Sequence, residues 1–362
     1  MSARVLVAMS GGVDSSVAAA ILRERGYDVV GVAMRLAPES AADARRRASC
    51  CSADDFEDAR RVAERMDFQF YVVDMRAEFG ARVIGNFVSE YLDGRTPNPC
   101  VMCNREIKFA RLFERAAALD AEYVATGHYA RIESDARGRY HLLRAADLTK
   151  DQSYFLFTLG QGELKRTLFP LGAMSKSEVR ARARALGLAN ADKPESQEIC
   201  FVPDSDYARF VERSAPAERV RPGRIIDSSG RTLAMHAGVH HFTIGQRRGL
   251  GVSAPSPLYV HEIREDSGDV VVGSRAGLGA AGLLARDISL VDPAEEIAEP
   301  IAIDARIRYR HPMLPATLAI EQASHARVTF VNGEGPAVTP GQACVFYRGD
   351  EVVAGGFIER AL

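Results

Sequence analysis

A glycine-rich stretch near the N-terminus constrains the fold of this chain more than any other feature. It reads Met9-Ser10-Gly11-Gly12-Val13-Asp14-Ser15-Ser16. An apolar run over residues 5–9, typical of a buried parallel strand, leads into it. Apolar residues at helical spacing follow, and Gly26 stands where a helix stop is expected. Gly11 and Gly12 permit close backbone approach, so the strand, loop and helix predict an anion-binding site.

The other side chains of the loop make this interpretation more specific. Ser10, Ser15 and Ser16 add hydroxyl donors, and Asp14 could support the loop or hold a Mg²⁺ ion. A strand-to-helix turn without a ligand would also tolerate the two glycines. No GxxxxGK[ST] or GxGxxG motif accompanies the string, which disfavours a P-loop NTPase or a dinucleotide-binding enzyme.

Strands alternate with helices in the first part of the chain. Further apolar strands are predicted over residues 28–36, 70–73 and 122–127, and a capped helix is predicted to open at Ser52. This alternation indicates an α/β fold with a doubly wound parallel sheet, whose ligand lies beyond the carboxyl ends of the strands. Met9, Met34 and Gly127 all fall at such ends and should share one edge.

Short strands between turns replace this pattern from about residue 215. We predict a first domain over residues 1–214, a small central β domain over 215–280 and a C-terminal β-barrel over 281–362. Arg306, Arg308 and Arg310 alternate along one predicted strand, whose face would suit phosphates. A solvated edge strand kept soluble by charge explains the same pattern equally well.

Composition limits the classes of function. A length of 362 residues predicts two or three domains, and no apolar run approaches the roughly 18 residues of a membrane span. The N-terminus shows no charged-then-apolar leader, so we expect a cytoplasmic protein without a membrane partner. A net charge of −2 gives no global attraction to nucleic acid, so RNA binding would depend on local arginine patches.

The cysteines are too few for a disulfide scaffold, but they cluster. Cys100 and Cys103 form a CxxC after a proline-bounded, partly exposed loop, and a helix is predicted over residues 104–119. Cys103 therefore lies near a helix N-terminus, where the dipole lowers a thiol pKa. A structural zinc site would need a second ligand pair at finger spacing, which the sequence lacks. The apolar neighbours of Cys200 favour a core position. Structural roles are also expected for the rest: Cys50, Cys51 and Cys344.

The histidines offer fewer indications. His128 follows Gly127 at the predicted ligand edge and could touch a nucleotide. His240 and His241 could suggest a metal, but adjacent residues on a strand point to opposite faces, so a joint ligand role is not expected.

Seven motifs, in order and far apart, give nearly the entire chain a family resemblance. They are SGGVDSS, TPNPCVMCNREIKF, ATGHYARI, KDQSYFLF, SQEICFV, FTIGQRRGLG and VTPGQACVFYRGDEVVAGG. The chain resembles the tRNA-specific 2-thiouridylase family, and its loop resembles that of PP-loop ATP pyrophosphatases. The resemblance implies thiolation of C2 of the wobble uridine of tRNA, with ATP converted to AMP and pyrophosphate. It also implies a PP-loop domain, a central β domain and a C-terminal barrel, and a persulfide donor protein (a cysteine desulfurase or relay protein) as partner.

The resemblance also assigns roles to residues. ATP and Mg²⁺ would bind at Ala8, Met9, Ser10, Gly11, Gly12, Val13, Asp14, Ser15, Met34 and Gly127. The tRNA would contact Asn98, Pro99, Cys100, Lys150, Asp151, Gln152, Arg308 and Tyr309. The catalytic residues would be Cys103 as the nucleophile, Cys200 as the persulfide carrier, and Asp14.

Two alternatives stay open. Some members of the family carry Asp in place of Cys100, so the CxxC is not universal. Cys100, Cys103 and Cys200 could instead hold an iron–sulfur cluster with one open iron, because thiolates are its usual ligands. Another PP-loop adenylating enzyme would share the loop, but it would lack the late Cys200 and the barrel and would not need tRNA.

Overall fold

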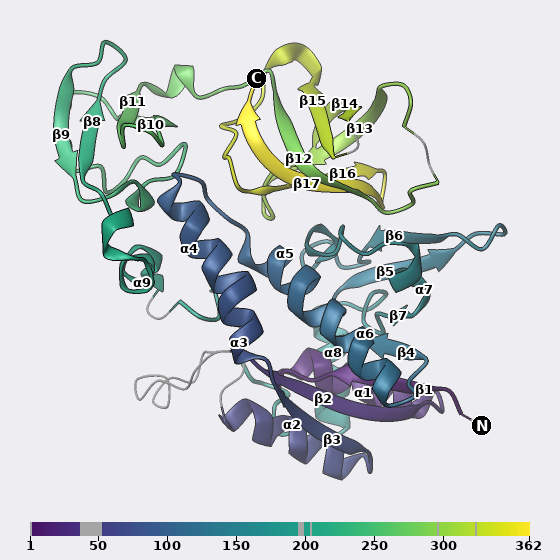
Figure 1. Cartoon of the computed structure of the whole chain (residues 1–362). Helices are drawn as coiled ribbons and strands as arrows, with labels where there is room; N and C mark the ends of the chain where they lie inside the picture. The colour runs from purple at the N-terminus through teal and green to yellow at the C-terminus, as the bar shows by residue number, and fades with distance from the viewer. Residues whose placement is uncertain (1, 37–52, 195–198, 203–204, 295–296, 323) are drawn as a thin grey trace.

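A computed structural model describes residues 2–36, 53–194, 199–202, 205–294, 297–322 and 324–362 (Figure 1). The predicted helix cap at Ser52 lies outside these residues, as do Cys50 and Cys51. The first region is built on a five-stranded parallel sheet in the order β3-β2-β1-β4-β7. Its strands are β1 (Arg4–Ala8), β2 (Asp28–Arg35), β3 (Gln69–Asp74), β4 (Tyr123–Ala125) and β7 (Thr167–Leu168).

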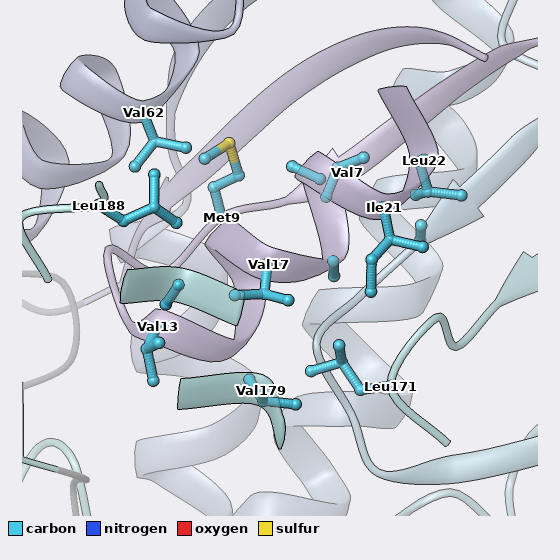
Figure 2. Packing of buried hydrophobic residues seen from close by; sticks show 14 of the residues in the cluster. Val7, Met9, Val13, Val17, Ile21, Leu22, Val62, Leu171, Val179 and Leu188 are labelled. Carbon is cyan, nitrogen blue, oxygen red and sulfur yellow. The ribbon is translucent and has the colours of Figure 1, made fainter. Parts of the chain in front are cut away.

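Helices cover both faces of this sheet, because the buried strands alternate their apolar side chains between the faces. Val5 and Val7 of β1 pack with α1 (Val13–Glu24), α2 (Ala53–Arg65) and α8 (Lys176–Ala185) on one side. Figure 2 shows Val7 among the side chains of this cluster. Leu6 faces the opposite side and packs with α6 (Ala110–Ala118). The predicted doubly wound α/β fold is confirmed.

Two long helical runs lead from this sheet to the rest of the molecule. The first joins α3 (Arg76–Phe79), η2 (Gly80–Ile84) and α4 (Gly85–Leu92). The second joins α5 (Pro99–Cys103), η3 (Asn104–Phe109) and α6. The helix predicted from residue 104 therefore begins five residues earlier. Proline is favoured at a first helical position, since no partner is needed there for its missing N–H, and Asn98 caps the start by accepting from the Val101 amide at 3.4 Å.

The C-terminal region is the predicted barrel, closed by pairing of its first and last strands. Its strands are β12 (Gly282–Leu290), β13 (Ile301–Arg306), β14 (Leu314–Gln322), β15 (His325–Phe330), β16 (Ala343–Arg348) and β17 (Glu351–Ala361). The hairpin β5 (Ala130–Ser134) and β6 (Tyr140–Arg144) joins this sheet through a Glu351–Leu143 pair. The chain thus ties its first region to the barrel by strand pairing, which the sequence pattern did not predict.

The three arginines do not form a common face on the barrel. Strand β13 ends at Arg306, so Arg308 and Arg310 do not continue its alternation. The Arg306 side chain is 11% exposed and donates to Asp151 at 3.1 Å, while Arg310 is exposed. A buried carboxylate needs a partner, and this pairing takes Arg306 out of reach of phosphates.

The central region is a small sheet in the order β10-β11-β8-β9. Its strands are β8 (Gly223–Ile226), β9 (Thr232–His236), β10 (Tyr259–Ile263) and β11 (Val270–Gly273). Within the described ranges, the other helices and turns are η4 (Ser153–Phe155), α7 (Gln161–Lys165), α9 (Tyr207–Ser214), η6 (Ala217–Arg219), η7 (Val239–His241), η8 (Arg275–Gly277) and η9 (Val331–Gly333). Among the residues described, no helix is long and apolar enough to cross a membrane.

Candidate active site

The glycine loop lies where the direction of the sheet connections reverses. Strand β1 stands between β2 and β4, so the crossovers leave it to opposite sides, and ligands of such sheets bind at this point. Residues 9–12 join β1 to α1 here. Gly127, just beyond β4, packs against the start of α1, where a Cβ on it would stand 2.7 Å from the Ser15 amide nitrogen. Met34 lies at the end of β2, at the same edge of the sheet.

The backbone of the loop requires glycine at position 11. Gly11 has a φ of +72°, and a Cβ there would stand 2.2 Å from the carbonyl oxygen of Asp55 at the start of α2. The loop is therefore pressed against α2. Its amides can reach a phosphate closely because no side chain intervenes.

Hydroxyl groups shape the loop and leave the helix start open. Ser15 Oγ accepts from the Ser10 amide at 3.1 Å and donates to the Gly12 carbonyl at 3.1 Å. Ser16 Oγ donates to the same carbonyl at 3.1 Å. Gly12 is the N-cap of α1, and no described side chain caps it. The first amides of α1 and the positive end of the helix dipole are therefore open to an anion.

The side chain of Asn190 stabilises the glycine loop by hydrogen bonds. Its amide nitrogen donates to the Gly11 carbonyl and to Ser16 Oγ, both at 2.9 Å, and the side chain is buried. Its role was not predicted from the sequence. Nothing local distinguishes it from other turn asparagines, because its partners lie 174 and 179 residues away.

Asp14, in the first turn of α1, is held by two residues that the sequence analysis also missed. Lys176 Nζ contacts both of its carboxylate oxygens at 2.8 Å, and the Tyr129 hydroxyl donates to Oδ1 at 2.8 Å. The Lys176 side chain is only 11% exposed. A cation is therefore fixed at the helix N-terminus. The Ser175 and Glu178 capping box could have identified the start of α8, but not the direction of Lys176.

A second lysine stands on the other side of the loop. Lys193 Nζ contacts Asp55 Oδ1 at 2.6 Å and Asp58 Oδ2 at 2.7 Å, both on α2. Burial disfavours its charge, but the hydrogen bonds to the two carboxylates outweigh burial and raise the pKa of Lys193. Lys193 therefore stays protonated and fixes α2 where it meets Gly11.

His128 lies at the predicted ligand edge of the parallel sheet, and its imidazole ring is neutral. Its Nδ1 lies 2.8 Å from Thr126 Oγ1, and its ring stacks on Phe109 with centroids 6.1 Å apart. Burial, followed by the nearby Lys108, lowers the pKa of His128 to about 3. The imidazole carries no charge at neutral pH.

The thiols differ in exposure from the sequence expectation. Cys100, in the first turn of α5, is exposed, whereas Cys103 is buried at 7% exposure rather than partly exposed. Cys200 is half-buried rather than a core residue. Cys103 and Cys200 belong to one apolar cluster, together with Phe79, Phe87 and Phe201. The structure thus brings these two distant thiols into the same surroundings. Most of the SQEI segment before Cys200 lies outside the described residues.

The loop that precedes η4 is stabilised by a buried carboxylate. Asp151 has a side chain 1% exposed and accepts from the amides of Ala145 and Ser153 and from Arg306. Gln152 exchanges hydrogen bonds with the backbone of Tyr129, which itself holds Asp14. Tyr129 therefore links the loop of Gln152, which is predicted to contact RNA, to Asp14 in the predicted nucleotide site.

Arg308 and Tyr309 lie between the barrel and the other regions. Arg308 is half-buried and donates to Thr339 Oγ1 and, at 3.3 Å, to the Ile244 carbonyl of the central region. Burial lowers the pKa of Arg308. The Tyr309 ring packs on Phe155 with centroids 4.4 Å apart.

The predicted base-contact segment borders a small cavity. Asn98 lines a space of about 50 Å³ together with Glu90, Met102, Arg105, Arg286 and Phe357. This cavity lies between the α4–α5 segment and the barrel. Pro99 is buried and fixes the first turn of α5 beside it.

Family models match the chain in three consecutive parts. A tRNA methyl transferase HUP domain matches residues 3–204, and a tRNA methyl transferase PRC-barrel domain matches residues 208–274. An aminomethyltransferase beta-barrel domain matches residues 280–358.

Curated relatives match over nearly their full length. A tRNA-specific 2-thiouridylase MnmA of Geotalea uraniireducens is 50% identical, covering 99% of this chain and 96% of the relative. Proteins of the same name from Geobacter metallireducens and Clostridium perfringens are 49% and 42% identical, with coverage of 99% of this chain and of 97% and 99% of the relatives. At this identity and coverage, the chain belongs to the tRNA-specific 2-thiouridylase family.

Proposed function

We propose that this protein uses ATP to replace the C2 oxygen of the wobble uridine of tRNA by sulfur. The observation that carries the proposal is the combination of a PP-loop at the reversal point of the sheet with Cys103 and Cys200 in one apolar cluster. The names of the curated relatives support tRNA 2-thiolation. A binding module without chemistry would need neither the loop nor the thiols.

The first step in this proposal is adenylation. Uridine O2 is a poor leaving group, so it attacks the α-phosphorus of ATP and pyrophosphate departs. The amides of residues 11–15 would bind the pyrophosphate, and Lys176 would supply a positive charge beside it. Ala8, Met34 and Gly127 would surround the nucleotide. Both Asp14 oxygens contact Lys176, so Mg²⁺ would be held mainly by the ATP phosphates.

The second step is sulfur transfer. The terminal sulfur of a persulfide on Cys200 attacks C2, and AMP leaves with the former O2. The Cys103 thiolate then attacks the Cys200 sulfur and breaks the sulfur–sulfur bond, which leaves 2-thiouridine and a Cys103–Cys200 disulfide. Cys103 could alternatively help to release hydrosulfide, which would displace AMP. An external dithiol reduces the disulfide, and a persulfide donor protein, a cysteine desulfurase or relay protein, recharges Cys200.

The proposed tRNA contacts surround this chemistry. Lys150 and Gln152 would meet the RNA from a loop that the buried Asp151 holds in place, so Asp151 would act through its neighbours. Arg308 and Tyr309 would contact it from the barrel side. Asn98, Pro99 and Cys100 would lie against the target base, which must leave the anticodon stack to reach them.

The deciding experiment measures two products with the full-length protein. Pyrophosphate release from ATP should depend on tRNA that carries a wobble uridine, and nucleoside mass spectrometry should detect 2-thiouridine once a persulfide donor is added. Equal pyrophosphate release without tRNA, and no thiolated nucleoside, would favour another PP-loop adenylating enzyme and overturn the proposal.

A loop variant tests the nucleotide site. Gly11→Ala should weaken ATP binding at least about tenfold, because its Cβ would meet the Asp55 carbonyl oxygen and its φ is left-handed. Gly26→Ala is the matched control, since Gly26 has a φ of +85° but no atom near its Cβ position. Both should lose stability, by about 1 kcal/mol for Gly26. Calorimetric titration with ATP measures the difference; equal affinity in the two variants would contradict the loop assignment.

A further inference from the structure

The central region carries a cluster of metal-ligating side chains that the thiolation chemistry does not use. The cluster consists of Glu212 on α9 and of His240 and His241 on η7, and one ligand atom from each lies within 4.8 Å of the others. The sequence expectation that the two histidines diverge is wrong. They lie on a 3-10 turn rather than a strand, and their ring centroids are 4.3 Å apart.

Both imidazoles converge on one carboxylate oxygen. Glu212 Oε1 lies 3.3 Å from His240 Nε2 and 3.1 Å from His241 Nε2. Zinc bonds to nitrogen and oxygen of about 2.0–2.1 Å in tetrahedral geometry place neighbouring ligand atoms about 3.3 Å apart. The nitrogen-to-oxygen distances of the cluster therefore match those of ligands around one ion.

The surroundings preorganise the cluster and leave it accessible. The His240 side chain is 1% exposed, and a Cβ on Gly238 would stand 2.4 Å from its ring, so the backbone fixes the ring. Glu212 and His241 are 39% and 36% exposed, which leaves a path for an ion.

We propose that Glu212, His240 and His241 form a site for a divalent transition metal of the zinc class, with water completing the coordination. Two imidazole nitrogens with one carboxylate oxygen are a donor set that suits zinc. The ion would fasten α9 to η7. Phe210 of α9 packs on Phe201 with centroids 5.3 Å apart, so the site would also steady the segment that carries Cys200.

Zinc titration of the purified, chelator-treated full-length protein tests the proposal. The wild type should bind one more zinc ion per chain than either Glu212→Gln or His241→Gln, with micromolar or tighter affinity. Zinc should raise the Tm of the wild type, and that rise should be lost in both variants. Both positions are half-exposed, so neither substitution should prevent folding. Glu218→Gln, at an exposed residue, and His311→Gln, at a half-buried one, are matched controls outside the cluster, and they should behave as the wild type.

X-ray absorption separates this site from the thiols. Cysteine thiolates also bind zinc, so the titration is repeated after Cys100, Cys103 and Cys200 are replaced by serine. The zinc that remains should show nitrogen and oxygen ligands only, including two imidazoles. Equal zinc content in the wild type and in Glu212→Gln, or binding only at millimolar zinc, would overturn the proposal and leave the cluster as a shared hydrogen bond.

Discussion

Replacing Cys200 by serine is expected to abolish 2-thiouridine formation while tRNA-dependent pyrophosphate release continues. In the proposed scheme Cys200 carries the transferred sulfur, and serine cannot form a persulfide, so thiolation should fall at least about a thousandfold. Adenylation depends on the PP-loop and should remain within a few-fold of the wild type. The two products, measured in one reaction mixture, separate the steps.

Cys103→Ser should stop the reaction at a different point. Without the Cys103 thiolate, the sulfur–sulfur bond between the uridine and Cys200 persists, so a covalent complex with tRNA should accumulate on a non-reducing gel. Added dithiol should release it. Release of hydrosulfide would leave no such complex, which distinguishes the two sulfur-transfer routes. If both cysteine variants kept full thiolation, the site assignment would be wrong.

Cys344 provides the matched control for these substitutions. It is fully buried in the barrel, and burial raises its pKa to about 12, so it remains a thiol and takes no part in the chemistry. Cys344→Ala should keep full thiolation with a small loss of stability.

Protein purified without oxygen should contain no iron or acid-labile sulfide; iron at one cluster per chain would instead favour cluster chemistry on Cys100, Cys103 and Cys200.

The parts of the fold that the sequence predicted are those specified by local pattern. Buried parallel strands appear as apolar runs, so β1, β2 and β3 were found within one or two residues. The glycine loop was found because Gly11 has a left-handed φ, a local backbone conformation that favours glycine. Local chemistry was sufficient for these elements.

Contacts between distant segments could not be predicted in this way. Lys176 lies 162 residues from Asp14, and Arg306 lies 155 residues from Asp151. The alternation of arginines suggested that Arg306 binds phosphate. In the structure, Arg306 instead donates to the buried carboxylate of Asp151. His240 and His241 were misjudged because a strand was assumed where the chain forms a 3-10 turn. Each of these errors concerns which partner a side chain meets.

Lys176→Ala is expected to lower tRNA-dependent pyrophosphate release by about a hundred- to a thousandfold, the usual cost of removing one preorganised electrostatic donor. Asp14 places a negative charge in the first turn of α1, beside the expected pyrophosphate position. Without Lys176 this carboxylate would repel the departing phosphates as well as lose its partner. Lys165→Ala, on the exposed surface of α7, is the matched control and should keep the wild-type rate.

A double substitution decides how Lys176 acts. If it only neutralised Asp14, then Asp14→Asn in the Lys176→Ala background would restore adenylation, because the repelling charge would be gone. We expect no restoration, since the ammonium group is held at 2.8 Å from Asp14 where it can also meet a leaving phosphate oxygen. Initial rates of pyrophosphate release for the two single variants and the double variant give the coupling between the residues. Full recovery in the double variant would show that Lys176 acts only as the counter-ion of Asp14. Unchanged adenylation in Lys176→Ala would show that Lys176 takes no part in the nucleotide site.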